Sequence, residues 1–122
     1  MKKRVLVVDD SDIVLAMARE ALEEGGFEVV TAPDAKESDA YIFDIRQPDL
    51  VILDVMLPGL DGDKKAKQLK ANALTRHIPV LLLSSKPEDE LGRLATEAGA
   101  DGFIRKPFDH RQFIAKVEEA TR

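Results

Sequence analysis

Short runs of apolar, often β-branched residues recur along the chain, and longer segments with a different spacing separate them. Three of these runs are apolar at every position, which is typical of strands buried on both faces of a parallel sheet. The pattern predicts strands at Val5–Val8, Phe27–Thr31, Leu50–Leu53, Val80–Leu83 and Gly102–Ile104.

The segments between the strands carry apolar residues at the i, i+3, i+4 spacing of a helix with one buried face. Gly25–Gly26 and Gly99 follow two of these patterns, and glycine commonly ends a helix. Four regular helices are predicted, with apolar residues at 13, 14, 17, 18, 21 and 22; at Ala66, Leu69 and Ala73; at Leu91, Leu94, Ala95 and Ala98; and at Phe113, Ile114, Val117 and Ala120.

A further helix is expected over about 34–46, although its pattern is the least regular. Tyr41, Ile42 and Phe43 are consecutive, so no single apolar face is defined. Pro48 disfavours a helical conformation at the preceding residue, which predicts an end at residue 46 or 47.

The alternation of strands and helices predicts an α/β fold with a five-stranded parallel sheet, right-handed crossovers and helices on both faces. In open sheets of this kind, ligands bind beyond the carboxyl ends of the strands. The residues that follow each strand are therefore the candidates for function.

Composition narrows the class of protein. The chain of 122 residues fits one domain, expected at 1–122, and its 44% hydrophobic and 34% charged residues are typical of a globular protein. Its net charge of −5 argues against a nucleic-acid-binding surface. The absence of cysteine excludes disulfides and thiolate chemistry, and no apolar run is long enough for a membrane helix. We therefore expect a cytoplasmic protein.

Acidic, hydroxyl and basic side chains follow four of the predicted strands. Asp9 and Asp10 follow the first strand, Asp54 the third, Ser84 the fourth and Lys106 the fifth. Because parallel strands end at one edge, these groups should converge there.

Clustered carboxylates repel each other and need a cation, and oxygen ligands favour Mg²⁺ over Zn²⁺. A carboxylate can attack phosphorus and form an aspartyl phosphate. Phosphoryl transfer depends mainly on positioning and charge neutralisation, which the metal, Lys106 and Ser84 could supply to the phosphoryl oxygens.

The same residues resemble a known family. Asp9–Asp10, Asp54 in DVMLPGLDG, Ser84 in PVLLLSS and Lys106 in GADGFIRKPF are similar to the receiver domain of bacterial two-component response regulators. The resemblance extends from Lys3 to about Thr121. It implies a three-layer, doubly wound (βα)5 fold with the flavodoxin-like strand order 2-1-3-4-5.

The resemblance implies a role for each site residue. Asp54 would be the phosphoacceptor, and Lys106 would pair first with the acids and then with phosphate. Mg²⁺ would be bound by the side chains of Asp10 and Asp54 and by the backbone carbonyl of Met56, with Asp9 helping directly or through water.

Two further residues would form a switch. Ser84 would move to bond a phosphoryl oxygen, and Phe103 occupies the position of a mobile aromatic residue, where it lacks a hydroxyl. Phe103 could instead be an ordinary aromatic residue at the edge of the core. The Lys106–Pro107 peptide bond would be cis.

The implied function is a phosphorylation-activated receiver rather than a multiple-turnover enzyme. Its donor would be a phosphohistidine on a histidine kinase or a histidine phosphotransfer protein. Phosphorylation would reshape the face formed by the fourth helix, fifth strand and fifth helix for a downstream protein or an attached output domain, as a monomer or a phosphorylation-dependent dimer.

Other interpretations stay open. The acids could cap a helix, Ser84 could bond the loop backbone, and Lys106 could be solvated. The chain could be a phosphorylation-independent pseudo-receiver that binds partners, although it lacks none of the acids or the lysine. A Mg²⁺-dependent phosphohydrolase would typically need a second Asp where Met56 stands.

Residues near the site have simpler expected roles. Gly62 is interpreted as a turn residue without a direct role. A group of lysines is interpreted as a solvated helix face, made by Lys64, Lys65, Lys67 and Lys70.

Overall fold

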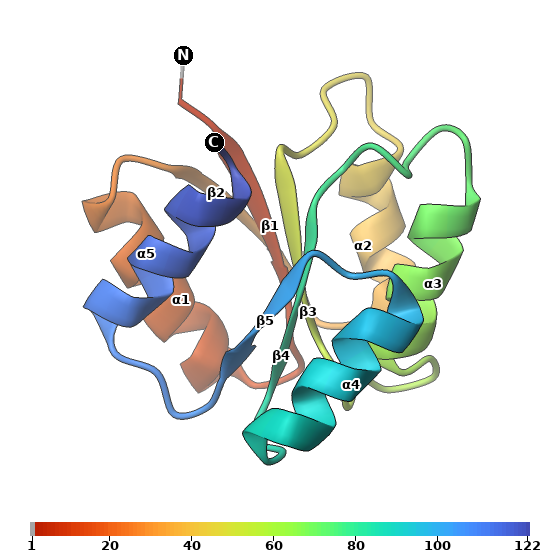
Figure 1. Ribbon diagram of the computed structural model, residues 1–122. Coiled ribbons are helices and arrows are strands. Elements are labelled where there is room, and N and C mark those ends of the chain that lie inside the picture. The colour runs from red at the N-terminus through yellow and green to blue at the C-terminus, as the bar shows by residue number, and fades with distance from the viewer. Residues whose placement is uncertain (1) are drawn as a thin grey trace.

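The computed structural model describes residues 2–122, in which five strands alternate with five helices (Figure 1). The strands are β1 (Arg4–Val8), β2 (Glu28–Ala32), β3 (Leu50–Asp54), β4 (Val80–Ser84) and β5 (Gly102–Arg105). The helices are α1 (Asp12–Glu24), α2 (Ala35–Ile42), α3 (Gly62–Ala71), α4 (Glu88–Ala98) and α5 (His110–Ala120). The strand bounds differ from the predicted ones by no more than one residue at either end.

The strands form one parallel sheet in the order β2-β1-β3-β4-β5. Helices α1 and α5 cover one face, and α2, α3 and α4 cover the other (Figure 1). This three-layer, doubly wound arrangement confirms the predicted fold class and strand order.

The sheet has an apolar layer on each side. Val5 and Val7 of β1 pack towards α1 and α5, whereas Leu6 and Val8 pack towards the other three helices. Successive side chains of a strand point to opposite faces, so a strand covered on both sides must be apolar throughout. The sheet is therefore a rigid frame for the residues at its carboxyl edge.

Two predicted helix ends are confirmed. Gly25 is the C-cap of α1, and Gly99 ends α4 in the left-handed region with φ of 73°. Among the helices of residues 2–122, none combines the length and the apolar character needed to cross a bilayer.

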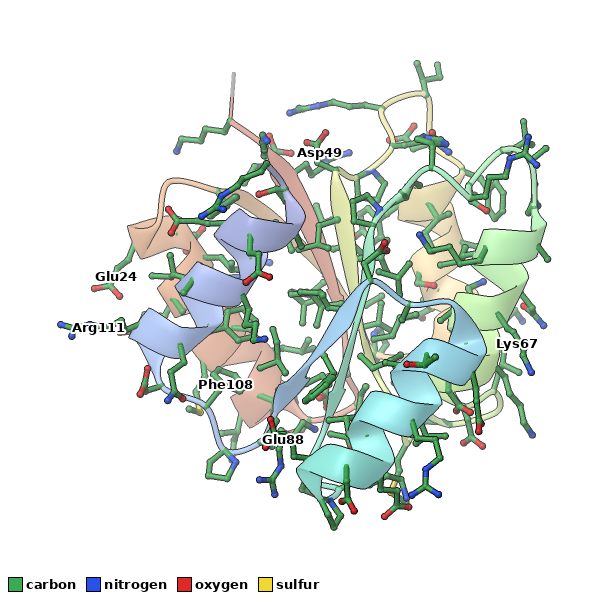
Figure 2. The ribbon with its side chains drawn as sticks, viewed as in Figure 1. Glu24, Asp49, Lys67, Glu88, Phe108 and Arg111 are labelled. Carbon is green, nitrogen blue, oxygen red and sulfur yellow. The ribbon has the colours of Figure 1, made fainter. Side chains whose placement is uncertain are left out.

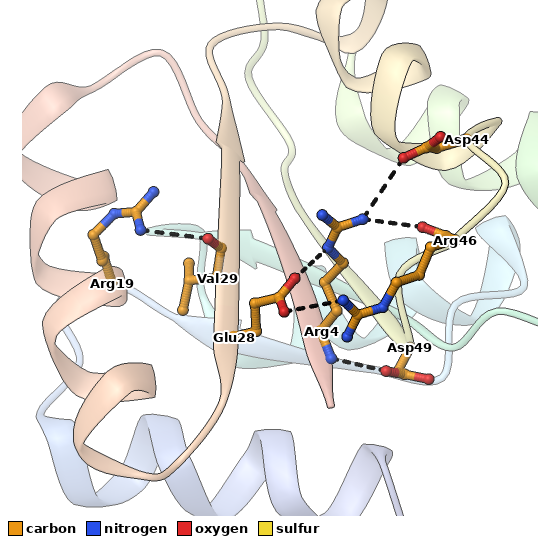
Figure 3. Close-up of polar contacts among 7 residues, drawn as sticks. All are labelled: Arg4, Arg19, Glu28, Val29, Asp44, Arg46 and Asp49. Atoms are coloured by element: carbon orange, nitrogen blue, oxygen red, sulfur yellow. Dashed lines mark hydrogen bonds and ion pairs between the residues drawn. The ribbon is translucent and has the colours of Figure 1, made fainter. Parts of the chain in front are cut away.

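The predicted extent of the second helix is wrong, because α2 ends at Ile42 instead of near residue 46. Arg4 of β1 binds the segment that follows: its guanidinium donates to the Arg46 carbonyl at 3.0 Å, and its backbone N–H donates to Asp49 at 2.8 Å (Figure 3). Arg4 and Arg46 also pair with Glu28 of β2 (Figure 3). These contacts between distant segments hold residues 43–49 as a loop.

The third helix also differs from its prediction. It ends at Ala71, so Ala73 lies outside it, and its lysines do not form one solvated face. Lys67 is exposed and points away from the sheet (Figure 2), but Lys65 is 5% exposed and pairs with Asp39 of α2. Lys65 lies one turn before the buried Leu69, so helical geometry places it on the inner face.

The Lys65–Asp39 pair generates a stability prediction. Asp39→Ala should lower the free energy of unfolding by about 1–2 kcal/mol, because it leaves a buried ammonium without its partner. Lys65→Met should change it by less than about 1 kcal/mol, because an apolar side chain of similar length replaces the buried charge. Urea unfolding of both variants measures the difference.

The double variant is the control for this pair. With Met at position 65, Asp39→Ala should cost almost nothing. An equal loss in both backgrounds would mean that Asp39 stabilises the protein without Lys65.

Candidate functional site

The candidate site lies at the carboxyl edge of the sheet, which is the lower edge in Figure 1. Strand register aligns the ends of the central strands, because Val8 is opposite Leu53 and Asp54 is opposite Leu83. Asp9 and Asp54 each come directly after the Val8–Leu53 pair, so they lie side by side at the ends of β1 and β3. Phe108 and Glu88 flank this edge, whereas Asp49 lies at the opposite end of the molecule (Figure 2).

Three carboxylates meet at this edge. Asp9, Asp10 and Asp54 each offer an oxygen, and these oxygens lie within 4.8 Å of one another. Asp9 and Asp54 are buried, and Asp10 is exposed. The fold thus joins two neighbouring residues to one that lies 44–45 positions further along the chain, as the strand-end argument predicted.

Lys106 lies between two of these acids. Its Nζ is 2.8 Å from Asp9 Oδ2 and 3.2 Å from Asp54 Oδ2. The contact with Asp54 is a hydrogen bond, whereas the contact with Asp9 is an ion pair without hydrogen-bond alignment. The peptide bond that follows, Lys106–Pro107, is cis, as predicted.

Burial and neighbouring charges shift the pKa values of Asp54 and Lys106. Burial raises the pKa of Asp54, the Asp9 carboxylate raises it further, and Lys106 only partly offsets both. Burial alone would lower the pKa of Lys106, but the Asp9 and Asp54 carboxylates raise it above its usual value. Lys106 therefore stays protonated, and one ammonium faces three carboxylates, an imbalance of charge that a divalent cation would remove.

The donor atoms fit such a cation. Asp9 Oδ1 accepts from the Ser11 N–H at 2.9 Å, whereas the buried Asp9 Oδ2 has no hydrogen-bond partner among the described residues. The Lys106 ammonium lies 2.8 Å from this oxygen and compensates part of its charge, so that a cation would complete the compensation across the three acids. An all-oxygen set suits Mg²⁺ and Ca²⁺ rather than Zn²⁺.

Ser84 is buried at the end of β4, next to β3. Its Oγ accepts from the Lys86 N–H at 3.1 Å, and its carbonyl accepts from the Lys106 N–H at 2.8 Å. The hydroxyl thus already bonds the loop backbone, which was one of the two interpretations of this serine. A Ser hydroxyl can accept this bond and still donate its proton elsewhere.

Met56 lies two residues after Asp54, whereas Phe103 lies within β5 and faces α4. The Met56 side chain is 72% exposed, and its N–H donates to Asp54 Oδ1 at 3.2 Å. The Phe103 ring is half-buried and lies against Gly92 of α4, with Lys116 Nζ 5.8 Å from its centroid. Whether the Met56 carbonyl binds metal and whether Phe103 moves stay predictions.

Gly62 has a structural role at the site that the sequence did not reveal. A Cβ there would lie 1.9 Å from the Asp54 carbonyl oxygen, and the Gly62 N–H donates to the Val55 carbonyl at 2.8 Å. The start of α3 therefore packs directly on the chain that carries Asp54. The GLDG segment was the available signal, but a turn explained it equally well.

Comparison with known protein families agrees with this geometry. A family model for the response regulator receiver domain matches residues 5–118. The phosphate regulon transcriptional regulatory protein PhoB of Pseudomonas aeruginosa is 39% identical over 120 residues, which cover 98% of this chain and 52% of that protein. The alkaline phosphatase synthesis transcriptional regulatory protein PhoP of Bacillus subtilis is 39% identical over all of this chain and 50% of its own length.

A solved structure has a similar fold. The chemotaxis response regulator CheY4 of Vibrio cholerae has a TM-score of 0.90 at 28% identity, covering 98% of this chain and 99% of that one. The chain spans about half the length of the curated relatives it matches.

The close approach at Gly62 predicts a large effect of one methyl group. Gly62→Ala should lower the free energy of unfolding by about 2–3 kcal/mol, because the backbone around Asp54 must shift to admit a Cβ. Gly92→Ala is the matched control, since its Cβ would lie at an ordinary 3.5 Å from Phe103. That variant should gain about 0.5–1 kcal/mol from helix propensity, and equal losses in both would contradict the assignment.

The raised pKa of Asp54 gives a second prediction. In EDTA at neutral pH the ionised carboxylate costs stability, and this cost disappears as pH falls through the folded-state pKa of Asp54. Asp54→Asn should therefore raise the urea midpoint at pH 7, and its advantage should shrink in acid. Asp12→Asn, in the same acidic run but outside the cluster, should show no such gain.

Proposed function

The chain belongs to the response regulator receiver domain family, and we propose that residues 1–122 act as one receiver domain that phosphorylation of Asp54 switches on. The proposed bounds include Met1, which lies outside the described residues. The observation that carries the proposal is the position of Lys106, with its ammonium within 3.2 Å of both Asp9 and Asp54. Together with Asp10, these groups supply an acceptor, a cation and a metal-binding set.

Asp54 is the proposed nucleophile. One of its carboxylate oxygens attacks the phosphorus of a phosphohistidine, so that a P–O bond forms while the P–N bond breaks. The electron pair of that bond stays on the imidazole nitrogen, which takes a proton from solvent. The rigid strand β3 and its contact with Gly62 hold Asp54 in place for this attack.

Mg²⁺ would be held by the side chains of Asp9, Asp10 and Asp54 and by the Met56 carbonyl. When bound, it would neutralise charge on the acids and the phosphoryl oxygens. Lys106 would transfer its contact from Asp54 to a phosphoryl oxygen, and its raised pKa supports a lasting positive charge.

The phosphoryl group would act by shifting a conformational equilibrium. It adds about −1.5 to −2 charges at Asp54, towards which the Ser84 hydroxyl and Lys106 are drawn. The loop after β4 would follow Ser84, and Phe103 could turn with it. A groove lined by residues of β5 and α5 and by Glu88 lies on the α4-β5-α5 face that would be reshaped.

The partners follow from family membership. A histidine kinase or histidine phosphotransfer protein would donate the phosphoryl group, and a downstream protein or an attached output domain would receive the signal. The curated relatives are named as transcriptional regulatory proteins and are about twice as long as this chain. Any contact with DNA would belong to such an output domain, and a phosphorylation-dependent dimer would use the α4-β5-α5 face.

The alternatives are less well supported. A pseudo-receiver has no need for a buried pair of acids bridged by a lysine, which this chain has. A phosphohydrolase needs a general acid, and the residue two positions after Asp54 is the exposed Met56.

The proposal predicts a defined covalent change. In Mg²⁺ and acetyl phosphate, the intact mass should rise by one phosphoryl group, and the gain should disappear in EDTA and in Asp54→Asn. Asp12→Asn should gain the group like the unaltered protein. A phosphoryl group on Asp54→Asn, or none on the unaltered protein, would refute the assignment.

A further inference from the structure

We infer that Arg105 is a positioning residue that holds the loop between β4 and α4 in its phosphoryl-free position by bonding the Lys86 carbonyl. The inference rests on the proposed function, because it concerns the loop that Ser84 would carry towards a phosphoryl group. Neither the acid cluster nor the metal set includes Arg105.

The contact is local and well defined. Arg105 is the last residue of β5 and pairs in register with Ser84 of β4. Its Nε donates to the Lys86 carbonyl at 3.0 Å. The Lys86 N–H in turn donates to Ser84 Oγ at 3.1 Å, so both backbone groups of Lys86 are engaged.

The loop between β4 and α4 is short, so one hydrogen bond from Arg105 can restrain its position. It links Ser84 to Glu88, the first residue of α4, through Ser85, Lys86 and Pro87. The Lys86 ammonium also lies 3.4 Å from Glu90 in α4. If Ser84 moves towards Asp54, the Lys86 peptide must move with it, and the bond to Arg105 must stretch or break.

The bond therefore opposes activation. A single hydrogen bond of this kind shifts an equilibrium by a few-fold, since protein–water bonds replace most of what is lost. Removing the bond should favour the phosphoryl-bound arrangement.

Charge alone predicts the opposite sign. Arg105 is next to Lys106 in sequence, and loss of its positive charge would weaken the attraction of an anion to the site. Tighter binding of a phosphoryl analogue after loss of Arg105 would thus identify the hydrogen bond as the cause.

The experiment compares Arg105→Met, Arg105→Lys and Arg93→Met. Arg105→Lys keeps the charge but has no Nε. Arg93→Met removes an exposed charge from α4, and among residues 2–122 this arginine forms no hydrogen bond or ion pair with the loop. The probe is beryllofluoride with Mg²⁺. The NMR signal of the Lys86 amide, followed during titration with beryllofluoride, gives the affinity for the probe. Without the probe, the same signal gives the hydrogen-exchange rate of the Lys86 amide.

Both Arg105 variants should bind beryllofluoride about threefold more tightly and exchange the Lys86 amide about threefold faster, while Arg93→Met behaves like the unaltered protein. Weaker binding in Arg105→Met, or unchanged affinity and exchange, would overturn the role of Arg105. If the unaltered protein bound no beryllofluoride, the proposed function would fail instead, and the exchange rates would still show whether Arg105 restrains the loop.

Discussion

The mutual repulsion of three carboxylates at a buried sheet edge is the constraint on which this molecule depends. A single ammonium, that of Lys106, lies against two of them and leaves the cluster with an excess of negative charge. Burial intensifies the repulsion, and it is burial first that raises the pKa of Asp54. This excess of negative charge favours the binding of a cation, and in the proposed function that cation and Lys106 would share the charge of a phosphoryl group.

Three carboxylates stay this close together only if the strands that carry them cannot move apart. All five residues of β3 and all five of β4 are buried, and apolar layers on both faces prevent the strands from moving apart to relieve the repulsion. Gly62 adds a direct backbone contact behind Asp54. The stability that the core supplies thus offsets the unfavourable contacts among the carboxylates at the carboxyl edge.

The parts that we propose to move lie just outside this frame. Ser84 is the last residue of β4, and its hydroxyl, the Lys86 peptide and Arg105 form a short chain of hydrogen bonds across the loop into α4. In the proposed function, a charge added at Asp54 would act on one end of this chain, whereas the α4-β5-α5 face lies at the other. A few bonds of modest strength can therefore set the balance between two arrangements.

Local patterns were sufficient to predict the strands, because buried parallel strands must be apolar throughout. They were also sufficient to predict which residues form the site, because the ends of parallel strands must meet at one edge. The same reasoning correctly predicted that Asp9, Asp10, Asp54 and Lys106 lie together. It failed at the end of α2, where Arg4 of β1 binds the loop after Ile42. It also failed at Lys65, which the spacing of α3 places on the inner face and which pairs with Asp39 of α2. Close approaches such as that at Gly62, and bonds such as that from Arg105 to Lys86, depend on how separate elements pack, and no spacing along the chain records those distances.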